Sequence, residues 1–331
     1  MPGFNMSQIR RFLRSTKIQI KDTAKRKVFK RYLDFIGKYE EILQKKFPKA
    51  MKVYRVFSVG FKDFYGDVKE FARVARLARL SENGSLQHLT RKEIEIYDKI
   101  PRDILKVSPV LLLTPLPFTN YLVFPLAYMF PRQLLCSHFW SLQQRIDFAV
   151  QLQRKRLLHY KPLFRCLQAR VDSISDKDLR SNFQNILYKL GSGMHPTTNE
   201  IISVKPLFSD RPFHLNLLWP SHKNNLLRVH GLSPMFGFRR RARLTDKAYY
   251  IREMDLAYLK EGVNSMTLDE LRNACFMRGL NPVNMRTEDM VEWLAQWSHV
   301  ASNVDESSYS LLLHCPVLLG YNQPTNWVLI H

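Results

Sequence analysis

Apolar residues recur at every third or fourth position along most of this 331-residue chain, which is the spacing of amphipathic helices. The pattern predicts helices over residues 32–43, 51–80, 175–188, 266–280 and 288–300. The sequence shows no strand alternation of any length, no internal repeat and no coiled-coil heptads. We therefore predict a mainly α fold.

The clearest local motif is MTLDELRNACFMRGL, over residues 266–280. Thr267 and Glu270 have the spacing of a capping box, and Gly279 is placed to end the helix. The helical spacing puts Arg272 and Arg278 on the outer surface. Two short helices with basic outer residues are typical of small modules that bind nucleic acid or protein, and equally of a purely structural hairpin.

One stretch departs from the amphipathic pattern, because residues 107–130 contain no charged side chain. A hydrocarbon core of about 30 Å needs about 20 apolar residues of helix, so this stretch is long enough to span a membrane. Its prolines remove backbone donors, and in lipid such breaks survive only where neighbours satisfy them. We predict a single Pro-kinked transmembrane segment, or two half-spans, packed against a second copy or a partner. The alternative is a buried core segment. The candidate positions within the span are Pro115, Pro117, Asn120 and Pro125.

The N-terminus has its own composition, since residues 1–31 carry ten Lys or Arg and one acid, Asp22. An acid-poor amphipathic start resembles a mitochondrial presequence, although a basic tail that binds lipid or RNA without cleavage has the same composition. The predicted organisation is a presequence-like segment over 1–31, an amphipathic helical region over 32–103, the transmembrane segment over 104–135 and a helical domain over 136–331.

Charge indicates the class of partner. The chain has 51 Lys and Arg against 29 Asp and Glu, a net charge of +22. Such a balance favours RNA or anionic lipid as partners, although a solvated basic surface is the alternative for any single run. Arginine suits bidentate contacts to phosphate. The candidate polyanion contacts are Arg239, Arg240, Arg241, Arg243, Arg272 and Arg278.

Catalytic signatures are missing from the sequence. There is no P-loop, no HExxH and no complete dinucleotide or EF-hand loop, and the histidines have no metal-ligand spacing. The four cysteines are scattered, which indicates reduced thiols. We therefore predict no catalytic residue, cofactor or metal site, and no enzymatic activity. The uncharged span lacks the acids or histidines that coupled transporters place at mid-membrane.

Several segments resemble one known family. TLDELRNACFMRGL, EDMVEWLAQW and SLLLHCPVLL are similar to the C-terminal ribosome-binding module of the LETM family, the leucine zipper–EF-hand-containing transmembrane proteins. LTRKEI at 89–94 and the Pro-rich stretch that ends at Phe130-Pro131 are similar to the family pattern around its single membrane segment. The resemblance covers about residues 45–320.

This resemblance implies a single-pass protein of the mitochondrial inner membrane, with a ribosome-binding-like helical domain over 136–331 in the matrix. The implied partners are the mitochondrial ribosome, through rRNA or a ribosomal protein, and inner-membrane lipid. The Pro-kinked span makes a second copy of the chain a further possible partner. The implied function is a scaffold for membrane-protein biogenesis, respiratory-chain function and mitochondrial homeostasis. The alternative is a potassium or calcium/proton antiporter, or a subunit of one, with Pro115, Pro117 and Asn120 along its path.

Two features of this sequence differ from the pattern of the LETM family. The residues after Asn322 contain neither a coiled coil nor an EF-hand, so we do not expect calcium sensing. Lys and Arg number five in the 20 residues before Val107 but two in residues 131–150, which by the positive-inside rule favours an N-terminal side in the matrix. The family orientation is the reverse, and we follow the family.

Overall fold

The computed structural model describes residues 48–81, 86–113, 126–127, 129–234, 239–262 and 266–330. The chain divides into two compact units, Met1–Asp63 and Phe64–His331. Of the first unit, the structure describes only the start of helix α2 (Pro48–Leu80). The second unit contains every site considered below.

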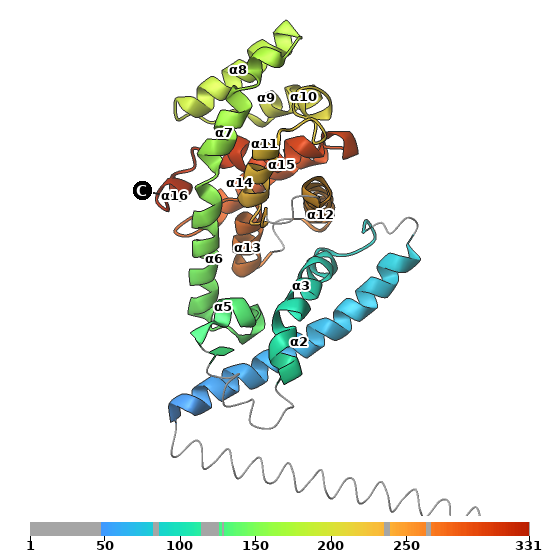
Figure 1. Ribbon diagram of the computed structural model, residues 1–331, viewed down its shortest axis with the longest axis vertical. Coiled ribbons are helices and arrows are strands. Elements are labelled where there is room, and N and C mark those ends of the chain that lie inside the picture. Colours follow the sequence, from blue (N-terminus) through green and yellow to red (C-terminus); the bar gives the residue numbers. More distant parts are fainter. Residues whose placement is uncertain are drawn as a thin grey trace, which may run out of the picture. The chain divides into compact units, whose positions relative to one another are not determined.

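The described residues contain helices and no strand, so the predicted mainly α class is confirmed (Figure 1). The predicted helix over 32–43 lies outside the described residues. After α2, the elements in chain order are α3 (Arg91–Leu113), α5 (Pro131–Leu134), the 3-10 turn η2 (Ser137–Phe139), α6 (Leu142–Leu157), α7 (Tyr160–Gln168), η3 (Val171–Ser173), α8 (Lys177–Gly191), α9 (Thr198–Ser203), α10 (Lys205–Ser209), α11 (Pro220–Val229), α12 (Arg240–Glu261), α13 (Leu268–Arg278), α14 (Thr287–Ser302), η6 (Glu306–Ser308), α15 (Tyr309–Gly320) and α16 (Pro324–Trp327).

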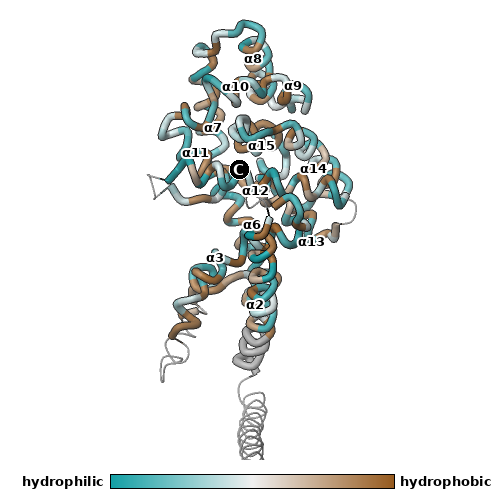
Figure 2. Tube along the Cα trace, turned by 90° about the vertical axis from the view of Figure 1, so that its right-hand side faces the viewer, coloured by the Kyte–Doolittle hydropathy of each residue, from teal (hydrophilic) through white to brown (hydrophobic). Residues whose placement is uncertain are grey.

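Helix α15 is the centre of the second unit. Every residue of α15 is buried, and α7, α10, α11, α12 and α14 all pack against it (Figures 1 and 2). Its sequence YSLLLHCPVLLG is apolar around nearly the whole circumference, and a helix of that kind is stable only when enclosed. Helix α12 lies between α15 and α3, so the N-terminal half of α3 joins the same core.

The helix-end signals of the sequence have the predicted geometry. In α13, the Thr267 backbone N–H donates to Glu270 Oε2 at 3.0 Å, and the Glu270 N–H donates to Thr267 Oγ1 at 3.4 Å. Gly279 follows with φ of +93°, the left-handed conformation that closes a helix. Helix α14 then packs on α13, as the apolar spacing of residues 288–300 predicted.

The end of α13 is held by a set of buried polar side chains. The Gly279 carbonyl accepts hydrogen bonds from Gln153 Nε2 and Tyr160 Oη, both at 2.7 Å, and from Asn326 Nδ2 at 3.2 Å. Arg156, which is also buried, donates to the Val229 carbonyl at 2.6 Å. Side chains from α6, α7 and α16 therefore hold the Gly279 carbonyl in place. These hydrogen bonds connect parts of the chain that are distant in sequence.

We expect Gly279→Ala to destabilise the protein more than Gly193→Ala. Both glycines have positive φ, which costs an L-residue about 1–2 kcal/mol. A Cβ at Gly279 would lie 2.2 Å from Tyr160 Oη, whereas one at Gly193 meets nothing within 4 Å. Displacing Tyr160 leaves buried polar groups unpaired, which adds about 1–3 kcal/mol. Urea unfolding of both variants measures the difference, and equal losses would contradict this account.

The predicted membrane segment lies mostly outside the described residues. Within the described part of the chain, no helix combines the length and the apolar character needed to cross a membrane. Residues 107–113 belong to α3, which starts at Arg91 and continues past Pro101 and Pro109. Residues 114–125, and with them Pro115, Pro117, Asn120 and Pro125, are not described. The same holds for residues 1–31, so the span and the presequence stay predictions.

Candidate polyanion-binding surface

The predicted arginine cluster lies at the start of α12, beside α11. Arg239 and Arg241 are exposed, and Arg240 and Arg243 are half-buried. The first turn of α12 contains no acidic residue, and Arg239 at the N-cap position makes no side-chain capping bond. The N-terminus of a helix carries a partial positive charge, so arginines there add to it rather than offset it. This end of α12 therefore has a strongly positive potential.

Helix α11 adds another cation to the same surface. Burial, followed by the nearby guanidiniums of Arg241 and Arg240, lowers the pKa of Lys223. The Lys223 ammonium also donates to the Asn216 carbonyl at 3.4 Å. Because α11 packs against α12, three cations from two helices repel one another at close range. An anion bound between them would relieve that repulsion.

An aromatic side chain lies at the start of α11. Trp219 is the N-cap residue of α11 and half of its surface is exposed. The Arg170 guanidinium lies 5.0 Å from the centre of the indole ring and donates to the Leu217 carbonyl at 3.0 Å. Trp219 and Lys223 are four residues apart, which puts them on the same side of the helix. We name Arg170, Trp219, Lys223, Arg239, Arg240 and Arg241 the basic surface.

The other two candidate arginines lie on α13 and differ from each other. Arg272 is exposed as predicted, and its Nη1 lies 3.6 Å from Asp269 Oδ1. No described contact connects Arg272 to the basic surface.

The prediction that Arg278 lies on the outer surface is wrong. Its side chain is fully buried, and its Nε donates to Asp255 Oδ1 at 2.9 Å. The other carboxylate oxygen of Asp255 accepts from Trp297 Nε1 at 2.9 Å, and the guanidinium lies 4.6 Å from the centre of the Tyr258 ring. A buried arginine needs such partners, and Asp255 comes from a different helix, α12. Arg278 is therefore a core residue and is unavailable to a polyanion.

Three residues of the basic surface were not predicted. Lys223, Arg170 and Trp219 stand alone in the sequence, outside any cationic run. One local signal was present, because Trp219 directly precedes Pro220, and proline is favoured at the first position of a helix. That signal places Trp219 at a helix start, but only the packing of α11 on α12 shows what lies beside it.

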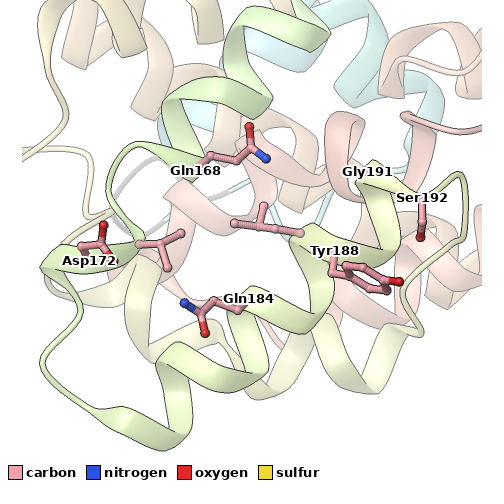
Figure 3. A pocket seen from close by; sticks show the side chains of 8 residues that line it. Gln168, Asp172, Gln184, Tyr188, Gly191 and Ser192 are labelled. Atoms are coloured by element: carbon pink, nitrogen blue, oxygen red, sulfur yellow. The ribbon is translucent and has the colours of Figure 1, made fainter.

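A shallow groove lies between the end of α7 and α8 (Figure 3). Its polar lining consists of Gln168, Asp172, Gln184, Tyr188 and Ser192. Gln168 and Gln184 belong to the two facing helices. Asp172 is the one carboxylate of this lining, and the lining contains no histidine or cysteine, so it does not form a nucleophile–base pair.

Comparison with known proteins identifies the family. The family model described as LETM1-like, RBD matches residues 89–318. This range includes all of α3 to α14, α15 except its C-terminal end, and the whole basic surface. The chain belongs to the LETM1-like family. It is 36% identical over 287 residues to LETM1 domain-containing protein 1 of Xenopus tropicalis, covering 86% of this chain and 81% of that protein.

Two other relatives are less similar in sequence. The identity to LETM1 domain-containing protein 1 of Homo sapiens is 31% over 291 residues, which covers 86% of this chain and 79% of that protein. The LETM1 domain-containing protein mdm28, mitochondrial, of Schizosaccharomyces pombe is 27% identical over 246 residues, or 72% of this chain and 50% of that protein. No solved structure matches this LETM1-like chain.

Proposed function

We propose that this LETM1-like protein is a scaffold of the mitochondrial inner membrane whose matrix domain binds the mitochondrial ribosome through the basic surface. The observation that carries the proposal is the convergence of Lys223, Arg240 and Arg241 from two helices. These cations lack an acidic partner in the first turn of α12. A phosphate backbone supplies the missing negative charge, and contacts of this kind provide most of the affinity of a protein for nucleic acid.

The chemistry of the surface favours RNA over an acidic protein. Arginine presents a planar fork that fits phosphate oxygens, and it also stacks on bases. Trp219 is exposed beside Arg170, and exposed aromatic side chains stack on unpaired bases with about 1–3 kcal/mol per base. Ribosomal RNA offers both phosphates and unpaired bases. We infer rRNA contact and leave a ribosomal-protein contact as the other outcome of the test.

A membrane tether is supported by the residues at and next to the two ends of the uncharged stretch. The end of α3 is apolar (Figure 2), and Leu105 and Leu112 expose about three quarters of their surface. At the C-terminal end of the stretch, Met129 and Phe130 are also exposed. Exposed apolar residues of this density are typical of a surface that contacts lipid or another protein. We propose that residues 107–130 anchor the protein in the bilayer as a single segment.

Cationic side chains on aromatic rings lie at both ends of this segment. The Lys106 ammonium is 4.5 Å from the centre of the Trp140 ring, and the Arg132 guanidinium is 5.9 Å from that of Phe148. Trp is enriched where a protein meets the headgroup region, and Lys and Arg are common next to membrane segments. The presequence-like start and the mitochondrial name of the Schizosaccharomyces pombe relative support a mitochondrial location. We propose the family orientation, with the C-terminal domain in the matrix.

The proposal is tested by salt-titrated co-sedimentation of the full-length protein, in detergent, with purified mitochondrial ribosomes. In the variant K223E/R239E/R240E/R241E we expect binding to weaken at least 100-fold at low salt. Each lost phosphate contact should also lower the slope of log affinity against log salt by about 1. The matched control reverses four exposed cations elsewhere, in R76E/R79E/R145E/K177E, and has the same net charge.

The control separates a defined surface from general attraction. Equal weakening in the two quadruple variants would mean that the overall positive charge, and not the basic surface, binds the ribosome. Unchanged binding in the first variant would remove the basic surface from the proposal. Replacing Trp219 with alanine should weaken binding without changing the salt slope if the ring stacks on a base. An unchanged affinity would favour a ribosomal protein as the partner.

A further inference from the structure

Three potential metal ligands meet where α3, α5 and η2 come together. They are Asp103 of α3, Cys136 between α5 and η2, and His138 of η2, and their ligand atoms all lie within 4.8 Å of one another. Cys136 is buried, while Asp103 and His138 are half-buried. The distance from Cys136 Sγ to His138 Nδ1 is 3.3 Å.

A carboxylate on α2 sets the orientation of the histidine ring. His138 Nε2 lies 2.7 Å from Asp67 Oδ2. An ionised carboxylate only accepts hydrogen bonds, so His138 carries its proton on Nε2. The lone pair of Nδ1 then points toward Cys136. Metal-binding histidines are held in this way, with the ring nitrogen that does not bind the metal donating to a carboxylate.

The third ligand has an oxygen without a partner. Asp103 Oδ2 is buried and makes no hydrogen bond within the described part of the chain. Burial raises the pKa of the Asp103 carboxyl, against the opposing effect of Lys99, His138 and Lys106. Burying a carboxylate oxygen without a partner is costly, and a cation at this point would remove the cost.

We propose that Asp103, Cys136 and His138 bind one divalent transition-metal ion of the zinc class, with water as the fourth ligand. Thiolate, imidazole and carboxylate together are the donors that zinc prefers. Zinc bonds of about 2.3 Å to sulfur and 2.0–2.1 Å to nitrogen place the two atoms about 3.5 Å apart in a tetrahedron. The separation of 3.3 Å therefore needs to widen by only a few tenths of an ångström.

The charge balance of the proposed site is complete. Without metal, the Cys136 thiol donates its proton toward His138 Nδ1, which lies 3.3 Å from the sulfur. When the ion binds, the S–H bond breaks, the sulfur–metal bond forms and the proton leaves to solvent. One thiolate and one carboxylate then neutralise the two positive charges of the ion.

The position of the site gives it a structural role. Asp103 precedes the uncharged stretch and Cys136 follows it, while Asp67 connects both to α2 through His138. A bound ion would fasten the two ends of the uncharged stretch to each other and to α2. The histidine spacing in the sequence indicated no metal. Cys136 lies close to His138 in the chain, but Asp103 and the supporting Asp67 come from distant segments.

Cobalt binding tests the proposal in the full-length protein purified in detergent. After treatment with a chelator, the protein is titrated with Co²⁺, which reports tetrahedral sites by visible absorption and thiolate ligands by a near-ultraviolet charge-transfer band. We expect both signals to saturate at one ion per chain and to disappear on addition of Zn²⁺. Variants C136S and H138Q should lose the bands, and D67N should weaken affinity by about 10–100-fold.

The matched control is C166S. Cys166 is a half-buried thiol that accepts from Asn225 Nδ2 at 3.7 Å, and it belongs to no group of potential metal ligands among the described residues. It should bind Co²⁺ like the unmodified protein. Far-ultraviolet circular dichroism of the metal-free variants checks that each is folded, and D103N replaces any variant that is not. Absence of both bands in the unmodified protein, or their survival in C136S, would overturn the proposal. Ribosome binding is not part of this test, so the two proposals fail independently.

Discussion

Replacing Arg278 with methionine is expected to lower the free energy of unfolding by about 3–5 kcal/mol, the usual cost of removing one partner from a buried ion pair. The substitution leaves Asp255 fully buried with a negative charge and only the Trp297 indole as a hydrogen-bond donor. The matched control is Arg272→Met on the same helix, because that side chain is about half exposed. A surface change of this kind should cost less than about 0.5 kcal/mol.

Urea unfolding followed by circular dichroism measures both variants, with the double variant R278M/D255L as the decisive addition. Removing both charges leaves no unpaired buried charge, although the buried Trp297 indole N–H loses its acceptor. The double variant should therefore recover part of the lost stability. A loss in R278M no greater than in R272M would mean that the Arg278 side chain faces solvent, as its sequence spacing predicted. A double variant less stable than R278M would mean that the cost of R278M does not come mainly from leaving Asp255 unpaired.

The contrast between these two arginines shows what the sequence could predict. Helix positions were predictable because their signals are local. A capping box needs only residues three apart, and Gly279 acts on the turn directly before it. Apolar spacing likewise identified α14 and its inward face, since Met290, Leu294 and Trp297 are all buried.

Long-range pairing was not predictable by the same reasoning. The helical spacing predicted that Arg278 lies on the outer surface of α13. Its partner Asp255 belongs to another helix, α12, and the sequence does not show that the two helices bring these residues together. The basic surface and the Asp103–Cys136–His138 cluster have the same character, because each joins residues from separate helices. A single sequence contains the members of such sites but not their proximity.

Acidification is expected to destabilise the protein steeply below pH 6.5, because three histidines are buried as neutral rings. Burial is the main cause that lowers the pKa of His222 to about 2, of His230 to about 3 and of His314 to about 4. Nearby cations act in the same direction, Arg170 on His222 and Arg156 with Lys247 on His230. No acidic group is among the causes of these shifts.

The hydrogen bonds account for the neutral state. His314 Nδ1 donates to the Ser310 carbonyl at 2.6 Å, and His222 Nε2 donates to His314 Nε2 at 2.7 Å. His230 Nε2 donates to the Leu313 carbonyl at 2.9 Å. Each ring thus uses its single proton. The Nδ1 atoms of His222 and His230 are buried and have no partner in the described residues, so a second proton there would have no acceptor.

The sign of the effect follows from these shifts. Because each pKa is lower in the folded state than the unfolded value of about 6.5, the stabilisation is fully present above pH 6.5. Below that pH the unfolded chain takes up three protons that the folded chain does not. At 1.36 kcal/mol per group and pH unit, the stability should fall by about 4 kcal/mol per pH unit until the folded-state pKa values are approached. At that slope, a domain with about 5–15 kcal/mol of stability would unfold between about pH 5 and about pH 3.

Urea unfolding at half-unit steps from pH 7.5 to 4.5 measures this slope. In His230→Asn the slope should fall by about one third, because the asparagine amide can still donate to Leu313 but does not titrate. His299→Asn is the control, since His299 is exposed, and its slope should match that of the unmodified protein. An equal slope in the His230 variant would mean that this ring accepts its proton while folded.

The same histidines connect stability to the basic surface. His222 and Lys223 are neighbours on α11, with His222 buried against α15 and Lys223 beside Arg240 and Arg241. Acid adds positive charge to the protein, which by attraction alone would strengthen binding to a polyanion. We expect the opposite below the unfolding transition, where ribosome binding should disappear together with the circular-dichroism signal. Binding that persists after that signal is lost would mean that the cationic run acts as an unstructured segment and that the arrangement of α11 and α12 is not required.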